Sequence, residues 1–136
     1  MKVLILGTFD LLHYGHIETL IRASELGTVY VGLGTDDYVT RYRGTPPIQT
    51  FKERERQLSA LGYTVVARAD ENIVRLLNHL SPDVLACGSD WFGKDFLGLS
   101  GITIADLEER DISLLYLPRG HFMSSTELKR RISESA

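Results

Sequence analysis

The segment GTFDLLHYGH, residues 7–16, holds the densest group of side chains able to do chemistry in this chain. His13 and His16 enclose Gly15 at the expected start of a helix. A helix N-terminus presents unpaired N–H groups and about half a positive charge, which suits phosphate. The imidazoles add two donors there, and Gly15 removes a Cβ where a ligand would approach the backbone. The pattern predicts a phosphate site, whereas the alternative for either histidine is a capping or core imidazole.

A second group of polar residues lies near the end of the chain. Arg119 is followed by three consecutive hydroxyl side chains, which are Ser124, Ser125 and Thr126. At the start of a helix, these residues could offer hydroxyls and N–H groups to phosphates. The spacing Ser124-x-x-Glu127 is also that of a capping box, which explains the serine without a ligand. Arg119 could likewise be a surface arginine.

The charge of the chain is unevenly distributed. The net charge is −3, which argues against duplex nucleic acid or an anionic membrane as the main partner. Residues 41–56 are nevertheless basic, because they hold five cationic side chains and only two acidic ones, Glu53 and Glu55. The cationic residues are Arg41, Arg43, Lys52, Arg54 and Arg56. The excess predicts a small polyanionic ligand, and the alternative is a solvated helix face.

Short apolar segments alternate with longer amphipathic ones, which predicts an α/β fold. We expect a Rossmann-like, doubly wound open parallel sheet of about five strands with helices on both faces. The strands are predicted at Lys2–Leu6, Val29–Gly34, Thr64–Ala67, Asp83–Ala86 and Ser113–Leu117. The helices are predicted at Tyr14–Leu26 with Gly27 as C-cap, Phe51–Leu61 ended by Gly62, Glu71–Leu80, Thr103–Arg110 and Ser125–Ser133. Ligands bind such sheets beyond the carboxyl ends of the strands, so each segment that follows a strand is a candidate.

Length and composition place the chain among single-domain proteins. Its 136 residues, of which 43% are hydrophobic, predict one domain spanning residues 1–136 with no need for a metal or disulfide staple. Its apolar runs are too short for a membrane span or an export signal. The single cysteine, Cys87, lies in an apolar segment typical of a buried strand. We therefore expect a cytoplasmic location.

The motifs together resemble the cytidylyltransferase-like nucleotidylyltransferase superfamily. His13-Tyr14-Gly15-His16 matches its HxGH signature, and the likeness is greatest to the glycerol-3-phosphate cytidylyltransferase group. Further matches follow in family order: Thr35-Asp36, Arg54, Gly88-x-Asp90-Trp91, Leu117-Pro118-Arg119 and Met123–Thr126. The last of these segments is similar to the family's RTxGISTT element.

The resemblance implies that a phosphomonoester such as glycerol 3-phosphate attacks the α-phosphorus of a nucleoside triphosphate, preferably CTP, and releases pyrophosphate. It implies catalytic roles for His13, His16 and Arg119. Nucleotide binding would fall on Gly7, Thr8, Phe9, His13, Gly15, His16, Arg43, Gly88, Asp90, Arg119, Ser124, Ser125 and Thr126. Acceptor binding would fall on Asp10, Arg41, Arg54 and Trp91. Mg²⁺ would arrive on the triphosphate without a protein-held metal site, and the protein would be a homodimer.

The chain departs from the family pattern at several positions. Arg41 and Arg43 replace a lysine pair, which keeps the charge and adds forked donors. His121-Phe122 makes the last loop bulkier, and basic positions of the glycerol-phosphate enzymes fall on Gly62 and Ile73. Three alternatives stay open: an adenylyltransferase of the same superfamily, which shares the phosphate-binding features, a non-catalytic nucleotide-binding or scaffold domain, and a flavodoxin-like signalling or flavin module. Trp91 could be a packing residue, and Asp90 could cap a turn.

Overall fold

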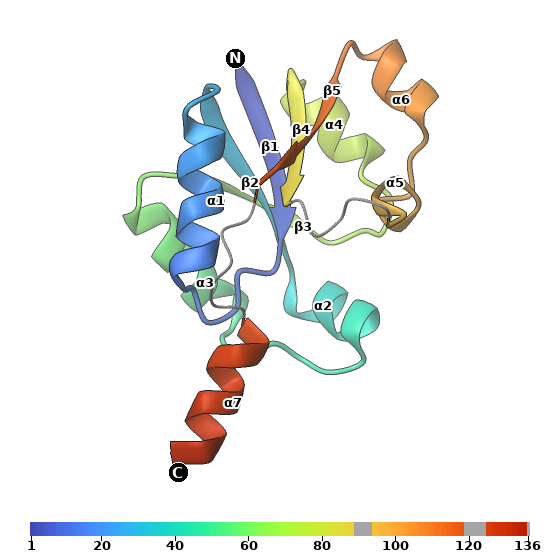
Figure 1. Ribbon diagram of the computed structural model, residues 1–136. Helices are drawn as coiled ribbons and strands as arrows, with labels where there is room; N and C mark the ends of the chain where they lie inside the picture. Colours follow the sequence, from blue (N-terminus) through green and yellow to red (C-terminus); the bar gives the residue numbers. More distant parts are fainter. Residues whose placement is uncertain (89–93, 119–124, 136) are drawn as a thin grey trace.

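The protein is built on a five-stranded parallel sheet with the strand order β3-β2-β1-β4-β5 (Figure 1). The computed structural model describes residues 1–88, 94–118 and 125–135, with the backbone alone for 125–128 and 135. The strands are β1 (Lys2–Gly7), β2 (Thr28–Gly34), β3 (Thr64–Arg68), β4 (Val84–Gly88) and β5 (Ser113–Leu117). The predicted fold class is confirmed.

The register of the central strands explains the two-sided core. Val3 lies opposite Val29 and Val84, and Ile5 lies opposite Val31 and Ala86. Since successive side chains of a strand point to opposite faces, these residues share one face, and Leu4 and Leu85 belong to the other. Near-continuous apolar runs are expected for strands that are covered on both sides.

Helices cover the two faces separately, and others lie beyond the carboxyl ends of the strands (Figure 1). Leu20 of α1 and Leu58 of α3 pack on the first face, whereas Leu77 of α4, Phe96 of α5 and Leu107 of α6 pack on the second. The helices are α1 (Tyr14–Ser24), α2 (Asp36–Arg43), α3 (Phe51–Ala60), α4 (Val74–Leu80), α5 (Phe96–Leu99), α6 (Ile104–Glu109) and α7 (Ser125–Ser135).

Most predicted elements are present, with three corrections. Helices α2 and α5 were not predicted, and α4 begins at Val74 rather than at Glu71. Gly27 is not a C-cap, because α1 ends at Ser24 and its C-cap is Glu25. A Cβ on Gly27 would clash with the carbonyl oxygen of Met1, so this glycine is needed for a close approach to the backbone. Gly62, by contrast, has the left-handed φ of 94° expected after a helix end.

Two further expectations concern burial and membranes. Cys87 is buried in β4, as its apolar surroundings in the sequence predict. The helices formed by the described residues include none with the length and apolar character needed to cross a membrane.

Candidate functional site

The loop between β1 and α1 has a strained backbone. Phe9 and Leu11 have φ values of 50° and 52°, in the left-handed region that residues with a side chain rarely adopt. Such conformations cost about 1–3 kcal/mol each and concentrate at functional sites. A Cβ on Gly7 would lie 2.6 Å from the ring of Phe9, so the glycine lets this ring fold back over the end of β1.

His13 and His16 lie together at the N-terminus of α1. Their rings stack with centroids 3.8 Å apart at an interplanar angle of 22°. The Nδ1 atom of His13 accepts a hydrogen bond from the backbone N–H of Gly15, at 3.1 Å, and the Nδ1 atom of His16 accepts from the backbone N–H of His13, at 3.4 Å. A neutral imidazole that accepts at Nδ1 carries its proton on Nε2. The contacts therefore fix both rings in the tautomer that donates from Nε2.

A cavity of about 280 Å³ opens next to this helix start. His16, Thr8 and Phe9 line it, and the ring of His13 stacks on that of His16. Gly88, at the end of β4, also lines the cavity. The structure thus brings together predicted nucleotide residues from two neighbouring strand ends, as expected for an open parallel sheet.

The buried carboxylate of Asp10 joins the first loop to the segment before α3. Its two oxygens accept hydrogen bonds from the backbone N–H groups of Ile48, at 2.8 Å, and Gln49, at 2.9 Å. The side chain of Gln49 adds a second link to the first loop, because its Oε1 accepts a hydrogen bond from the backbone N–H of Leu11 at 2.9 Å. The Nζ atom of Lys129, in α7, lies 3.7 Å from Asp10 Oδ2. Asp10 also lines the cavity, so it holds the loop in place at the border of the site.

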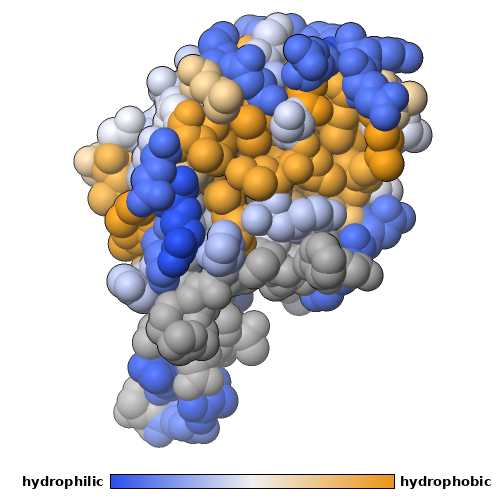
Figure 2. All heavy atoms as spheres, turned by 45° about the horizontal axis from the view of Figure 1, so that its top comes forward, coloured by the Kyte–Doolittle hydropathy of each residue, from blue (hydrophilic) through white to orange (hydrophobic). Residues whose placement is uncertain are grey.

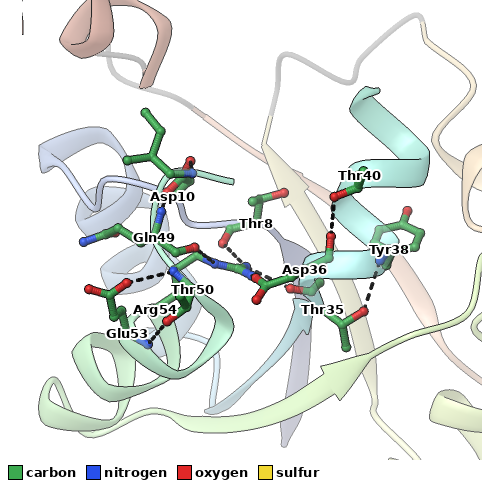
Figure 3. Close-up of polar contacts among 12 residues, drawn as sticks. Thr8, Asp10, Thr35, Asp36, Tyr38, Thr40, Gln49, Thr50, Glu53 and Arg54 are labelled. Carbon is green, nitrogen blue, oxygen red and sulfur yellow. Dashed lines mark hydrogen bonds and ion pairs between the residues drawn. The ribbon is translucent and has the colours of Figure 1, made fainter. Parts of the chain in front are cut away.

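Arg54 occupies the centre of a polar network at the same end of the sheet (Figure 3). Its side chain is fully buried, and its Nη1 donates to the carbonyl oxygens of Thr8, at 2.9 Å, and Gly34, at 2.8 Å. Its Nε donates to the carbonyl oxygen of Gln49 at 3.0 Å, and its Nη2 pairs with Asp36 Oδ1 at 2.7 Å. The protein thus encloses the guanidinium in this structure, and the contact with an acceptor that the sequence predicts stays a prediction. Arg54 positions the loops around the site.

The other predicted arginines of this region are exposed and differ in their surroundings. Arg41 pairs with Glu71 through an Nε–Oε1 contact of 2.8 Å and donates to the carbonyl oxygen of Ala69. The hydrogen bond between the Arg41 and Glu71 side chains holds the pKa of Glu71 below its usual range and raises the pKa of Arg41. Arg43, two residues on, lines the cavity. The basic segment is therefore neither a uniform phosphate cluster nor a simple solvated face.

Sequence reasoning missed a group of cavity residues on the β2–β3 side. Tyr38 and Tyr42 of α2 stack with parallel rings, and Arg68 at the end of β3 lies over the ring of Tyr38. All three line the cavity. The position of Arg68 directly after a predicted strand was the signal that could have identified it, whereas the tyrosines belong to a helix that was not predicted.

Several predicted site residues lie outside the described residues. They are Asp90, Trp91, Arg119 and Ser124, together with the side chains of Ser125 and Thr126. The backbone places Ser125 at the first position of α7. Within the described ranges, no group of three or more His, Cys, Asp and Glu side chains is arranged to hold a metal ion.

Comparisons with known sequences agree with the motifs. The family model described as cytidylyltransferase-like matches residues 4–131. A glycerol-3-phosphate cytidylyltransferase of Bacillus subtilis is 31% identical over 97% of this chain and 97% of its own length. A FAD synthase of Pyrococcus abyssi is 37% identical over 66% of this chain and 64% of its length. The bifunctional protein HldE of Campylobacter concisus is 41% identical over 68% of this chain, which spans only 20% of that relative.

Comparison with solved structures gives the same fold. A lipopolysaccharide core biosynthesis protein from Thermoplasma volcanium superposes with a TM-score of 0.69 at 21% identity, over 90% of this chain and 98% of the other. A pantoate-β-alanine ligase from Francisella tularensis has a TM-score of 0.52 at 12% identity, over 97% of this chain and 69% of the other. At these identities the likeness shows the fold alone.

Proposed function

Because this chain belongs to the cytidylyltransferase-like family of nucleotidylyltransferases, we propose that it transfers CMP from CTP to a small phosphomonoester. An oxygen of the phosphomonoester attacks the α-phosphorus, a new P–O bond forms, and the bond from the α-phosphorus to the oxygen that bridges to the β-phosphate breaks. Pyrophosphate leaves with the electron pair of that bond. Glycerol 3-phosphate is the first acceptor to test, since the Bacillus subtilis relative that matches nearly the whole chain carries that name.

The observation that carries the proposal is the arrangement of His13 and His16. Both imidazoles use Nδ1 to accept backbone hydrogen bonds, so both hold their proton on Nε2. His16 lines the cavity at the N-terminus of α1, where the helix dipole already favours an anion. In our proposal the two rings donate to the α-phosphate and the leaving oxygen, where negative charge increases in the transition state.

The reaction needs no strong base. A phosphate monoester has its second pKa near 6, so the nucleophile is already mostly dianionic at about pH 7. Catalysis is then a matter of holding two polyanions in line and stabilising the charge that develops between them. Arg43 lines the cavity and supplies a positive charge for this purpose. We propose further contacts to the β- and γ-phosphates from Arg119 and the residues at the start of α7.

We propose that Mg²⁺ enters with the triphosphate. Mg²⁺ commonly binds through substrate phosphates and keeps several water ligands, so a dedicated protein cage is not required.

Adenylyl transfer from ATP is the second candidate. The FAD synthase of Pyrococcus abyssi is 37% identical to two thirds of the chain, a higher identity than that of the cytidylyltransferase, although over a shorter length. Both reactions use the same phosphate chemistry, and the base pocket separates them.

Pyrophosphate release across four nucleoside triphosphates and a panel of small phosphomonoesters tests the proposal. We expect CTP to have the highest kcat/KM. An advantage of ATP over CTP by a factor of about ten, worth 1.4 kcal/mol, would favour the adenylyltransferase. Nucleotide binding without turnover on any pair would favour a non-catalytic binding domain.

A further inference from the structure

Arg68 lies in a part of the cavity that the sequence motifs do not account for. It is the last residue of β3 and lines the cavity with Tyr38 and Tyr42 from α2. The HxGH motif follows β1, Gly88 ends β4, and the chain continues from β5 toward α7. The strand order is β3-β2-β1-β4-β5, so these nucleotide motifs follow β1 and its neighbours β4 and β5 on one side. Arg68 belongs to the other side.

The guanidinium of Arg68 is held in one orientation by neutral groups. Its Cζ atom lies 4.3 Å from the centroid of the Tyr38 ring. Its Nη2 donates to the carbonyl oxygens of Glu71, at 2.9 Å, and Leu99, at 3.3 Å, and its Nε donates to that of Asp70 at 3.3 Å. Tyr38 is itself buried, so the ring provides a fixed platform for the cation.

The charge of Arg68 is poorly compensated by its surroundings. Among the described residues, no carboxylate forms an ion pair with it, and the nearby carboxylate of Glu71 is bonded to Arg41. Burial lowers the pKa of Arg68 below its ordinary value. A partly buried cation that faces a cavity is stabilised when an anion enters. Exposed Arg43 lines the same cavity and adds a second guanidinium.

We propose that Arg68 binds the phosphate of the acceptor phosphomonoester, with Tyr38 as the platform that orients its guanidinium. The inference rests on the proposed function, because it takes the nucleotide to occupy the side of the cavity formed by β1 and β4. Arginine suits this role since its planar fork binds phosphate through two parallel hydrogen bonds. The sequence offers no basic residue at Gly62 or Ile73, and Arg68 supplies a cation from a different position.

Steady-state kinetics of Arg68→Gln and Arg68→Lys test the assignment. We expect the KM for the phosphomonoester to rise about tenfold or more in Arg68→Gln, since a charge-assisted hydrogen bond to its phosphate is lost. The KM for the nucleotide should change less than about twofold, because those contacts lie elsewhere. Arg68→Lys should recover only part of the loss, since lysine lacks the fork. Arg56→Gln is the matched control, because Arg56 is exposed on α3 and lines no cavity that Arg68 lines, and it should behave as the wild type.

Direct binding of inorganic phosphate keeps the test independent of turnover and of variant stability. In the wild type saturated with a non-hydrolysable CTP analogue, phosphate should shift the amide NMR signals of residues 38–43 and 66–71. Arg68→Gln, if its thermal unfolding shows that it is folded, should abolish the shifts. Absence of these shifts in the wild type would overturn the assignment even if neither variant folds.

The outcomes separate this inference from the proposed function. If Arg68→Gln has the kcat of the wild type and an unchanged KM for the phosphomonoester, the role of Arg68 alone is overturned. A rise in the nucleotide KM without a rise in the acceptor KM would also overturn it, because Arg68 would then serve the triphosphate. A wild type that neither binds nor turns over any nucleoside triphosphate contradicts the proposed function itself.

Discussion

The imidazoles of His13 and His16 have two tasks that use different atoms. Each Nδ1 closes the first turn of α1 by accepting a backbone hydrogen bond. Each Nε2 then carries the proton, which is the atom that can serve a phosphate. The capping and catalytic interpretations of these residues are therefore compatible, and variants can separate them.

Replacing His16 by alanine should lower kcat about 10²- to 10³-fold, the usual cost of removing one donor to developing charge. The cap should cost only about 1 kcal/mol of the free energy of unfolding. His16→Asn is the matched variant, because its short side chain can keep a capping acceptor without the full reach of the imidazole. Rapid-quench turnover and chemical denaturation should show a stable but slow enzyme. A kcat near that of the wild type in both variants would remove His16 from the chemistry.

Arg119 is predicted to bind the triphosphate on the basis of its sequence motif, and it lies outside the described residues. Arg119→Lys keeps the charge but loses the bidentate fork, so activity should fall about tenfold or more. A surface substitution typically changes the free energy of unfolding by less than about 0.5 kcal/mol, so the melting temperature should hardly move. Full turnover in both Arg119→Lys and Arg119→Ala would show that the arginine plays no part in the reaction.

Arg54 connects three segments around the end of the sheet. Its contacts reach Thr8 after β1, Gly34 at the end of β2, and Gln49 before α3 (Figure 3). Asp10 adds the link from the first loop to residues 48 and 49. The strained loop at Phe9 and Leu11 is held between these two anchors.

Arg54→Met should reduce the free energy of unfolding by about 3 kcal/mol, because it leaves buried carbonyl oxygens without their donor. Urea denaturation gives this value, and Arg56→Gln, an exposed position on the same helix, should stay within about 0.5 kcal/mol of the wild type. We also expect a lower kcat in Arg54→Met at temperatures where the variant is folded. Equal losses of stability in the two variants would contradict the anchoring role.

A broad apolar area covers part of one side of the molecule (Figure 2). Exposed apolar side chains include Ile21 of α1 and Ile104 of α6, and β5 forms one edge of the sheet. Large exposed apolar areas often mark protein–protein contacts.

We propose that the protein is a homodimer. Size-exclusion chromatography with light scattering should give twice the 15.3 kDa chain mass at micromolar concentration. A monomer mass that persists on raising the concentration would contradict the proposal. The residues for which we propose catalytic roles all belong to one chain in our proposal. We therefore expect dissociation to affect stability more than kcat, which should be measured over the same concentrations.

The sequence was sufficient for the five strands, for most of the helices and for the helix start that borders the cavity. Apolar runs bounded by turn residues located all five strands to within a few residues, since a buried parallel strand must be apolar on both faces. The HxGH motif located the helix start next to the cavity, because capping and phosphate chemistry both depend on local spacing. Helix α2 escaped prediction because its eight residues give only about two turns in which a helical period can be recognised.

Only the tertiary structure decided which charged residues face the cavity. Arg54 and Arg43 belong to the same basic segment, yet Arg54 is buried as an anchor whereas Arg43 lines the site. Arg68, some distance along the chain, reaches the cavity because β3 ends beside β2 in the sheet. Charge can be counted from the sequence, but its role depends on burial and on which carbonyl oxygens and rings surround it. Those surroundings come from strands distant in sequence and are fixed only when the sheet has formed.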